Sequence, residues 1–394
     1  MMASLRNRFL IVSGLAVALV AFVPACGGAA ADKEKPAPAA QQEAAPAPKP
    51  APAYDHALTD EARVLAGLDP EDTQRFAPVI TRASWKAHKA DFDTNWGQIA
   101  QQRFPLMRDW RDREFKPVVD ACDTLFYPFG GPDFLNAYLF FPTCNQYLLF
   151  GLETVGSVPA LEKMKDDRLD KALGETRLAL ADIFKRAYFI TKSMEKELRT
   201  SQVDGTVPVI LVMLARVDAQ IVKIETDGPW NAKDGAAGRL PSATISFIAK
   251  GSDRVQKVTY IRVDMMNPNF SKQASLLAFL KGLGPVTTFV KSASYLMHDD
   301  RFSMVRDIVL GQSKALLQDD TGVPYKFFDK AKWTLTFYGK YSKPISDFNY
   351  GFQKDLDAAF KQPGAAKDLP FSFGYHWREG TSSVILAIRN AAAQ

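Results

Sequence analysis

The sequence contains little of two residue types that commonly bind metals, since its 394 residues include three cysteines and four histidines. No two of the histidines have the i,i+4 spacing that places two ligands on one face of a helix. The chain also lacks a large excess of positive charge, because residues 54–394 carry 44 Lys and Arg against 41 Asp and Glu. A glycine-rich loop followed by Lys-Ser or Lys-Thr is absent as well. We therefore expect no metal, no cofactor and no nucleic-acid partner.

The N-terminus has the pattern of a secretory signal peptide. A small-or-apolar run, Phe9–Val23, is shorter than the ~20 residues of a membrane-spanning helix and follows Arg6 and Arg8. The sequence Val-Pro-Ala-Cys that ends at Cys26 resembles the lipobox of bacterial lipoproteins. This resemblance implies that residues 1–25 are a lipoprotein signal peptide. It also implies that Cys26 becomes the mature N-terminus, with a diacylglycerol thioether and an N-linked acyl chain such as palmitate.

The segment after the cysteine has nothing to bury. Residues 27–53 contain 11 Ala and 6 Pro and no aliphatic residue larger than alanine, no methionine and no aromatic residue. We therefore expect 26–53 to be a disordered linker, which at ~3.1 Å per residue could reach roughly 80 Å. In the lipoprotein families, the absence of Asp after the lipidated cysteine implies the outer membrane, and Gly27 stands there. We expect a lipid-anchored envelope protein at the outer membrane, facing the periplasm.

Residues 54–394 have the periodicities of an α+β globular body. Helical spacing dominates the first part, as in Asp91–Glu114, and strand patterns dominate later, as in a hairpin at 243–265. We predict a helix-rich N-terminal half packed with a mainly antiparallel sheet from the C-terminal half. A Gly-, Ala- and Asp-rich segment at 227–241 is the candidate boundary if the body has two lobes.

The sequence predicts some individual helices and strands clearly and leaves others ambiguous. The apolar stretch Val209–Leu214 fits either a helix or a strand. The pattern in Phe302–Leu317 predicts a helix, and Phe371–Tyr375 and Ser383–Ile388 each predict a strand.

Two cysteines remain for the body. Cys122 and Cys144 would lie in an oxidising compartment, and a bridge between them would close a loop of about 20 residues. We predict a disulfide, with two buried free thiols as the alternative.

Linear catalytic motifs are weak throughout. Gly311–Ala315 resembles a nucleophile elbow without its second glycine, and Ser193–Lys196 fits Ser-x-x-Lys without a Lys-Thr-Gly partner. Asp320-Thr321-Gly322 resembles the aspartic-protease loop, but the residues before it do not form an apolar strand pattern, and a turn that ends a helix explains it. We interpret these matches as structural, so the sequence favours a protein that is not an enzyme.

Aromatic and glycine-rich stretches are the better candidates for a ligand site. Residues 127–142 combine a turn at Gly130 and Gly131 with many aromatic rings, and residues 369–377 have the same character. Binding clefts combine aromatic walls with a few placed polar groups. The candidate binding residues are Tyr127, Asp133, Asn136, Tyr375, His376 and Trp377. A core strand entered through a turn is the alternative explanation of the first stretch.

These two stretches, together with 151–156 and 317–325, resemble blocks of an uncharacterised family of bacterial secreted and lipid-anchored proteins. The resemblance implies kinship and carries no activity, cofactor or catalytic residue. Our first hypothesis is a lipid-anchored envelope protein that is a non-catalytic binding or structural module, with an envelope protein or a glycan as its ligand. The alternative is a periplasmic hydrolase of glycan, peptide or ester. Its candidate residues are Asp133, Glu153, His298, Asp320 and His376.

Overall fold

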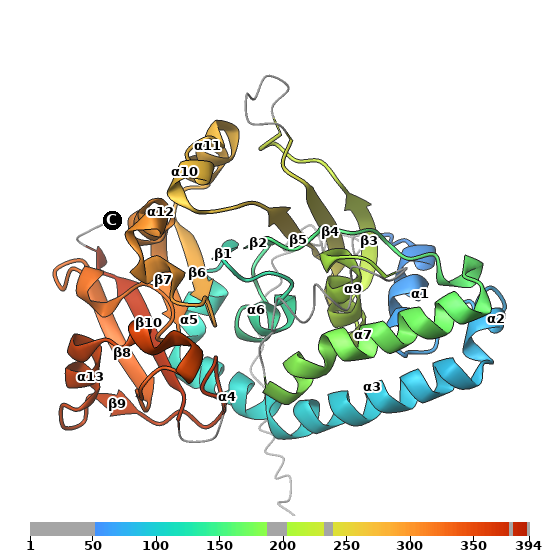
Figure 1. The fold of residues 1–394 in the computed structure, drawn as a ribbon, viewed down its shortest axis with the longest axis horizontal. Helices are drawn as coiled ribbons and strands as arrows, with labels where there is room; N and C mark the ends of the chain where they lie inside the picture. The colour runs from blue at the N-terminus through green and yellow to red at the C-terminus, as the bar shows by residue number, and fades with distance from the viewer. Residues whose placement is uncertain (1–51, 187–202, 232–238, 378–380, 392–394) are drawn as a thin grey trace, which may run out of the picture. The chain divides into compact units, whose positions relative to one another are not determined.

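A ten-stranded sheet forms the centre of the protein (Figure 1). The computed structural model describes residues 52–186, 203–231, 239–377 and 381–391. The strand order is β3-β4-β5-β2-β1-β6-β7-β10-β8-β9. The strands are β1 (Thr124–Tyr127), β2 (Gln146–Gly151), β3 (Gln220–Glu225), β4 (Ser242–Ile248), β5 (Val255–Arg262), β6 (Val286–Val290), β7 (Ser313–Gln318), β8 (Trp333–Gly339), β9 (Ala366–Lys367) and β10 (Ser383–Arg389). The predicted α+β class is confirmed.

The sheet is mixed rather than mainly antiparallel. Its five middle strands, β5-β2-β1-β6-β7, are all parallel. Antiparallel pairs lie on either side of them, at β3-β4-β5 and at β7-β10-β8. Two of the middle strands, β1 and β2, come from the N-terminal half of the chain. Parallel strands that are buried on both faces lose the alternation that marks a half-exposed strand, and every residue of β1 and β6 is buried.

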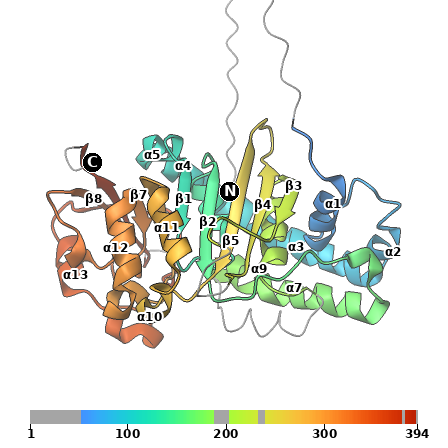
Figure 2. The same ribbon diagram turned by 90° about the horizontal axis from the view of Figure 1, so that it is seen from above.

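Helices cover both faces of this sheet. One face packs in a core that receives side chains from α1, α3, α4, α6, α7 and α9. The opposite face packs against α10, α11 and α12, and Figure 2 shows α12 beside β7. The helices are α1 (His56–Leu65), α2 (Ala77–Ile80), α3 (Ala83–Gln102), α4 (Phe104–Glu114), α5 (Lys116–Asp120), α6 (Phe134–Phe140), α7 (Asp166–Arg186), α9 (Thr206–Arg216), α10 (Asn267–Phe270), α11 (Ala274–Gly282), α12 (Ser303–Gln312) and α13 (Lys354–Phe360).

The apolar stretch that fitted either assignment is a helix. All residues of α9 are buried, so the helix has no solvent-facing side that would give its sequence a polar period. Gly205 precedes it at φ +81°, and a side chain there would collide with the backbone of Gly156. This close approach holds the start of α9 against the loop after β2.

Two predicted elements are wrong. The segment 302–317 is a helix only as far as Gln312, because Ser313 begins β7 and its hydroxyl contacts that of Thr288 in β6 at 2.6 Å. Residues 371–375 form no strand and make one isolated bridge, between Phe373 and His376. In the first segment, pairing with a distant strand overrides the local helical pattern. In the second segment, the lack of a strand partner overrides the local strand pattern.

Cys122 and Cys144 form the predicted disulfide, with Cα atoms 4.8 Å apart. The strands that flank 227–241, β3 and β4, are antiparallel neighbours in the sheet, and residues 232–238 lie outside the described residues. The predicted signal peptide, Cys26 and nearly all of the predicted linker also lie outside them. Within the described ranges, no helix has the length and apolar character needed to cross a membrane.

Candidate functional site

Of the ten strands that the structure describes, eight run in one direction and end at one edge of the sheet, and only β4 and β10 run the opposite way. The five middle strands are parallel, and β8 runs in the same direction because β7 and β8 both pair antiparallel with β10. The loops after β1, β6, β7 and β8 therefore meet there, together with the segment that leads into β10. We call this region the strand-end site and define it by residues 127–136, 291–295, 319–322, 342 and 374–376.

The chain changes direction at this edge between β1 and β6. After β1 it enters α6 on one face of the sheet, and after β6 it reaches α12 on the opposite face. Such a divergence opens a crevice outside the carboxyl ends of the two strands, and open α/β sheets bind ligands in such crevices. The strand-end site occupies this topological switch point.

Backbone strain is concentrated in the same loops. Among the described residues, five non-glycine residues have positive φ, and four of them lie in the loops after β1 and β6. These are Phe129 (φ 60°), Ser292 (φ 53°), Ser294 (φ 50°) and Tyr295 (φ 55°). A left-handed conformation is unfavourable for aromatic residues and persists only where surrounding contacts enforce it, a situation common at functional sites.

A buried ion pair lies at the centre of the site. Asp133 Oδ2 is 2.8 Å from Lys291 Nζ, and the two side chains are 4% and 2% exposed. Asp133 also accepts a hydrogen bond from the Tyr127 hydroxyl at 3.1 Å and from the Asn136 amide at 2.8 Å. Three residues predicted from the sequence thus converge, although Asp133 and Asn136 are buried and act in the scaffold of the site. Lys291, which the sequence analysis missed, neutralises Asp133.

Two adjacent carboxylates follow β7 and point in different directions. Asp319 accepts the backbone N–H groups of Ser292 at 2.8 Å and of Thr321 at 3.0 Å, whereas Asp320 accepts the Tyr295 hydroxyl. Burial raises the pKa of both carboxyls, and the charge of Asp319 helps to raise the pKa of Asp320 to about 7. The donors around Asp319, with the charge of Lys291, oppose the rise in its pKa. Asp320 therefore holds its proton more readily than Asp319 does.

This loop also corrects the sequence interpretation of Asp320-Thr321-Gly322. A strand, β7, does precede it, so it is not a turn that ends a helix. The two carboxylates have separate hydrogen-bond partners, because Asp319 accepts the Ser292 backbone N–H and Asp320 accepts the Tyr295 hydroxyl, so they do not form the shared-proton pair of an aspartic protease.

The segment before β10 closes the site from the other side. The Tyr375 hydroxyl donates to Ser292 O at 2.8 Å, and its ring stacks on Phe348 with centroids 5.0 Å apart. His376 Nδ1 lies 3.2 Å from the Ser342 hydroxyl oxygen. Trp377 is half-buried, next to residues 378–380, which lie outside the described residues. Gly374, at φ +61°, leaves room for the Asp319 carboxylate, with which a side chain would collide.

The five hydrolase candidates lie around the same edge but do not form one acid–base pair. Asp133 is held by Lys291, and Glu153 accepts the Tyr260 hydroxyl at 3.0 Å. His298 packs edge-on against Tyr295, and burial lowers the pKa of His298 to about 4. Within the described ranges no group of three or more His, Cys, Asp or Glu side chains could hold a metal ion.

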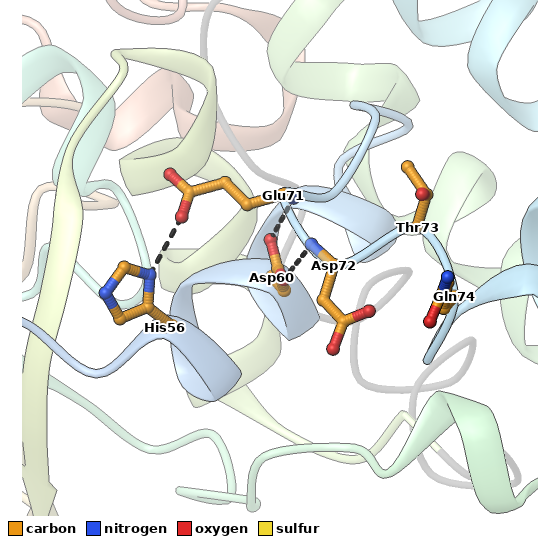
Figure 3. Close-up of a pocket in the computed structure, with 6 residues that line it drawn as sticks. All are labelled: His56, Asp60, Glu71, Asp72, Thr73 and Gln74. Carbon is orange, nitrogen blue, oxygen red and sulfur yellow. Dashed lines mark hydrogen bonds and ion pairs between the residues drawn. The ribbon is translucent and has the colours of Figure 1, made fainter.

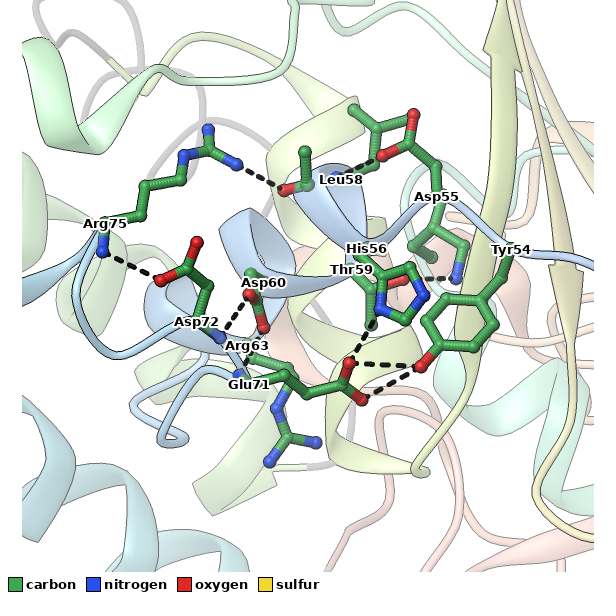
Figure 4. Close-up of polar contacts among 12 residues, drawn as sticks. Tyr54, Asp55, His56, Leu58, Thr59, Asp60, Arg63, Glu71, Asp72 and Arg75 are labelled. Carbon is green, nitrogen blue, oxygen red and sulfur yellow. Dashed lines mark hydrogen bonds and ion pairs between the residues drawn. The ribbon is translucent and has the colours of Figure 1, made fainter.

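Two surface hollows lie elsewhere and offer less chemistry. The first is lined by His56, Asp60 and the loop 71–74 (Figure 3). Its polar groups already bind one another, because Glu71 contacts His56 at 2.9 Å and Asp60 accepts the backbone N–H groups of Glu71 and Asp72 (Figure 4). We interpret it as a clamp that holds this loop on α1. The second hollow, around Arg113 and Lys367, contains the surface ion pair between Lys367 and Glu114.

Comparison with known proteins adds no assignment. No known family model matches the chain, and no curated protein matches its sequence.

Proposed function

We propose that this protein is a lipid-anchored component of a bacterial cell envelope that binds a glycan at the strand-end site. The observation that carries the ligand-binding part is the meeting of strained loops with a buried ion pair at the switch point of the sheet. The anchoring part is supported by the lipobox-like sequence at Cys26 and the Ala- and Pro-rich linker after it. A body on such a tether can reach polymers that lie some distance from the membrane.

The aromatic residues beside the site support a sugar as the ligand. Tyr350 is 70% exposed, an unusual state for a large aromatic ring, and lies 6.1 Å from Phe348 between ring centroids. Phe348 in turn stacks on Tyr375, so the three rings form a continuous aromatic cluster beside the strand-end site. We call Phe348, Tyr350 and Tyr375 the aromatic wall. Flat apolar rings with polar groups at their edge suit the apolar face and the hydroxyl rim of a sugar.

The test uses soluble muropeptides released from bacterial cell wall as the probe. Isothermal titration calorimetry should detect binding to the wild type, and Tyr350→Ala should weaken it about tenfold, since one ring contact contributes ~1.4 kcal/mol. Tyr350 is largely exposed, so its removal should leave the melting temperature nearly unchanged.

Leu178→Ala is the matched control, because Leu178 is also a large exposed side chain, at 61%, and lies on α7 away from this edge. It should bind like the wild type. The proposal fails if the wild type does not bind muropeptides, or if Tyr350→Ala binds them as well as the control does.

A further inference from the structure

Ser342 and His376 contact each other, although no linear sequence motif predicts this pair. The Ser342 hydroxyl oxygen lies 3.2 Å from His376 Nδ1, and both residues are partly exposed. They come from the loop after β8 and the segment before β10, 34 residues apart in the chain. We propose that Ser342 and His376 are a nucleophile and general base that hydrolyse a carboxylic ester at the strand-end site.

The protonation state that this chemistry needs agrees with the surroundings of His376. For Nδ1 to accept the hydroxyl proton of Ser342, the neutral ring must carry its own proton on Nε2. Nε2 is buried, and no hydrogen-bond partner for it occurs among the described residues. The charge of Asp319 acts on the same ring and favours the imidazolium form. Burial outweighs this charge and lowers the pKa of His376, which keeps the ring neutral and able to accept a proton.

Both partners are held by the fold rather than by each other. Tyr341, next to Ser342, is buried, and its hydroxyl accepts the backbone N–H of Gln353 at 2.8 Å. The backbone carbonyl of His376 accepts the Ser382 hydroxyl, which in turn accepts the backbone N–H of Phe373 at 2.8 Å. The contact between Ser342 and His376 is therefore set by two anchored segments, as a preorganised catalytic pair requires.

The reaction proceeds in two balanced steps. Ser342 Oγ attacks the ester carbonyl carbon while its proton moves to His376 Nδ1, and the C–O bond to the alcohol then breaks as that proton passes to the leaving alkoxide. Water attacks the resulting acyl-serine, gives its proton to Nδ1, and the proton returns to Ser342 Oγ as the carboxylic acid leaves. Asp319 is a positioning residue in both steps, because it stabilises the transient imidazolium.

The substrate class is an ester of a small carboxylic acid on a sugar hydroxyl. The aromatic wall would hold the sugar, and the acyl carbonyl would face Ser342. This part of the inference rests on the proposed glycan site, whereas the nucleophile–base pair does not.

The experiment treats the purified protein with a fluorophosphonate probe and locates the adduct by peptide mass spectrometry. We expect the adduct on Ser342, together with measurable hydrolysis of p-nitrophenyl acetate. His376→Asn should slow labelling at least 100-fold, the usual contribution of a general base. In Asp319→Asn the pH midpoint of labelling should fall, because the charge that raises the pKa of His376 is gone.

Ser346→Ala is the matched control, since Ser346 is an exposed serine on the nearby 3₁₀ helix Ser346–Gly351. It should be labelled at the wild-type rate, whereas Ser342→Ala should not be labelled. Adduct mapping in the wild type decides the question even if a variant fails to fold. An adduct only on other serines, no adduct at all, or unchanged labelling in folded His376→Asn would overturn the inference. If muropeptides still bind in that case, the esterase inference fails and the binding proposal stands.

Discussion

The ion pair between Lys291 and Asp133 can be tested by a double-mutant cycle. At 2.8 Å and an effective dielectric constant near 20, the attraction between the two charges is about 6 kcal/mol. Both side chains are almost fully buried, so most of this attraction offsets the loss of their hydration. Lys291→Met keeps the aliphatic stem but removes the cation in direct contact with Asp133, although Arg103 still interacts with this carboxylate. We expect the free energy of unfolding to fall by about 3–5 kcal/mol.

Asp133→Asn should destabilise the protein by a similar amount, because it leaves the Lys291 ammonium buried without its anion. An asparagine can still accept the backbone N–H of Asn136 at the start of α6, so the helix cap is kept. The double variant removes both charges, and its loss should be at least 2 kcal/mol smaller than the sum of the single losses.

Urea unfolding followed by tryptophan fluorescence measures all four proteins, with the disulfide intact. The reasoning is refuted if Lys291→Met costs less than about 1 kcal/mol, or if the two single losses add in the double variant. Either result would mean that another group, such as Arg103 or water, neutralises Asp133 in place of Lys291.

Two further predictions concern other parts of the chain. Burial raises the pKa of Glu61 to about 8, so folding keeps this carboxyl protonated while the unfolded chain ionises above pH 4.5. The free energy of unfolding that this group contributes is lost as the pH rises from 4.5 to 8. At pH 9, Glu61→Gln should therefore have a free energy of unfolding about 3–5 kcal/mol larger than that of the wild type. At pH 4 the two proteins should be nearly equal in stability. A stability difference that does not change with pH in urea titrations would contradict this assignment. At the N-terminus, Cys26→Ser should abolish lipidation and move the protein to the soluble fraction or leave its signal uncleaved; processed protein that still fractionates with membranes would refute the anchor.

Local patterns in the sequence predicted several features of the fold correctly. The hairpin of β4 and β5, strand β10 and the bridge between Cys122 and Cys144 follow from alternation, turn residues and cysteine count. These signals are properties of short segments, so they can be interpreted without knowing which distant segment packs against them. The lipid anchor and the linker are predictions of the same local kind, and they stay predictions.

The tertiary structure alone decided the strand order and the site. Parallel pairing between β1 and β6 joins segments about 160 residues apart in the chain. The sequence of neither strand indicates which strand it pairs with. Asp133 and Tyr375 stood out in the sequence as polar groups among aromatic residues, but their partners Lys291 and Ser292 did not. The contact between Ser342 and His376 exists because β7 and β8 run in the same direction on either side of β10. Chemistry made by loops from different strands depends on the order of those strands, and that order is set by burial over the whole sheet rather than by any single segment.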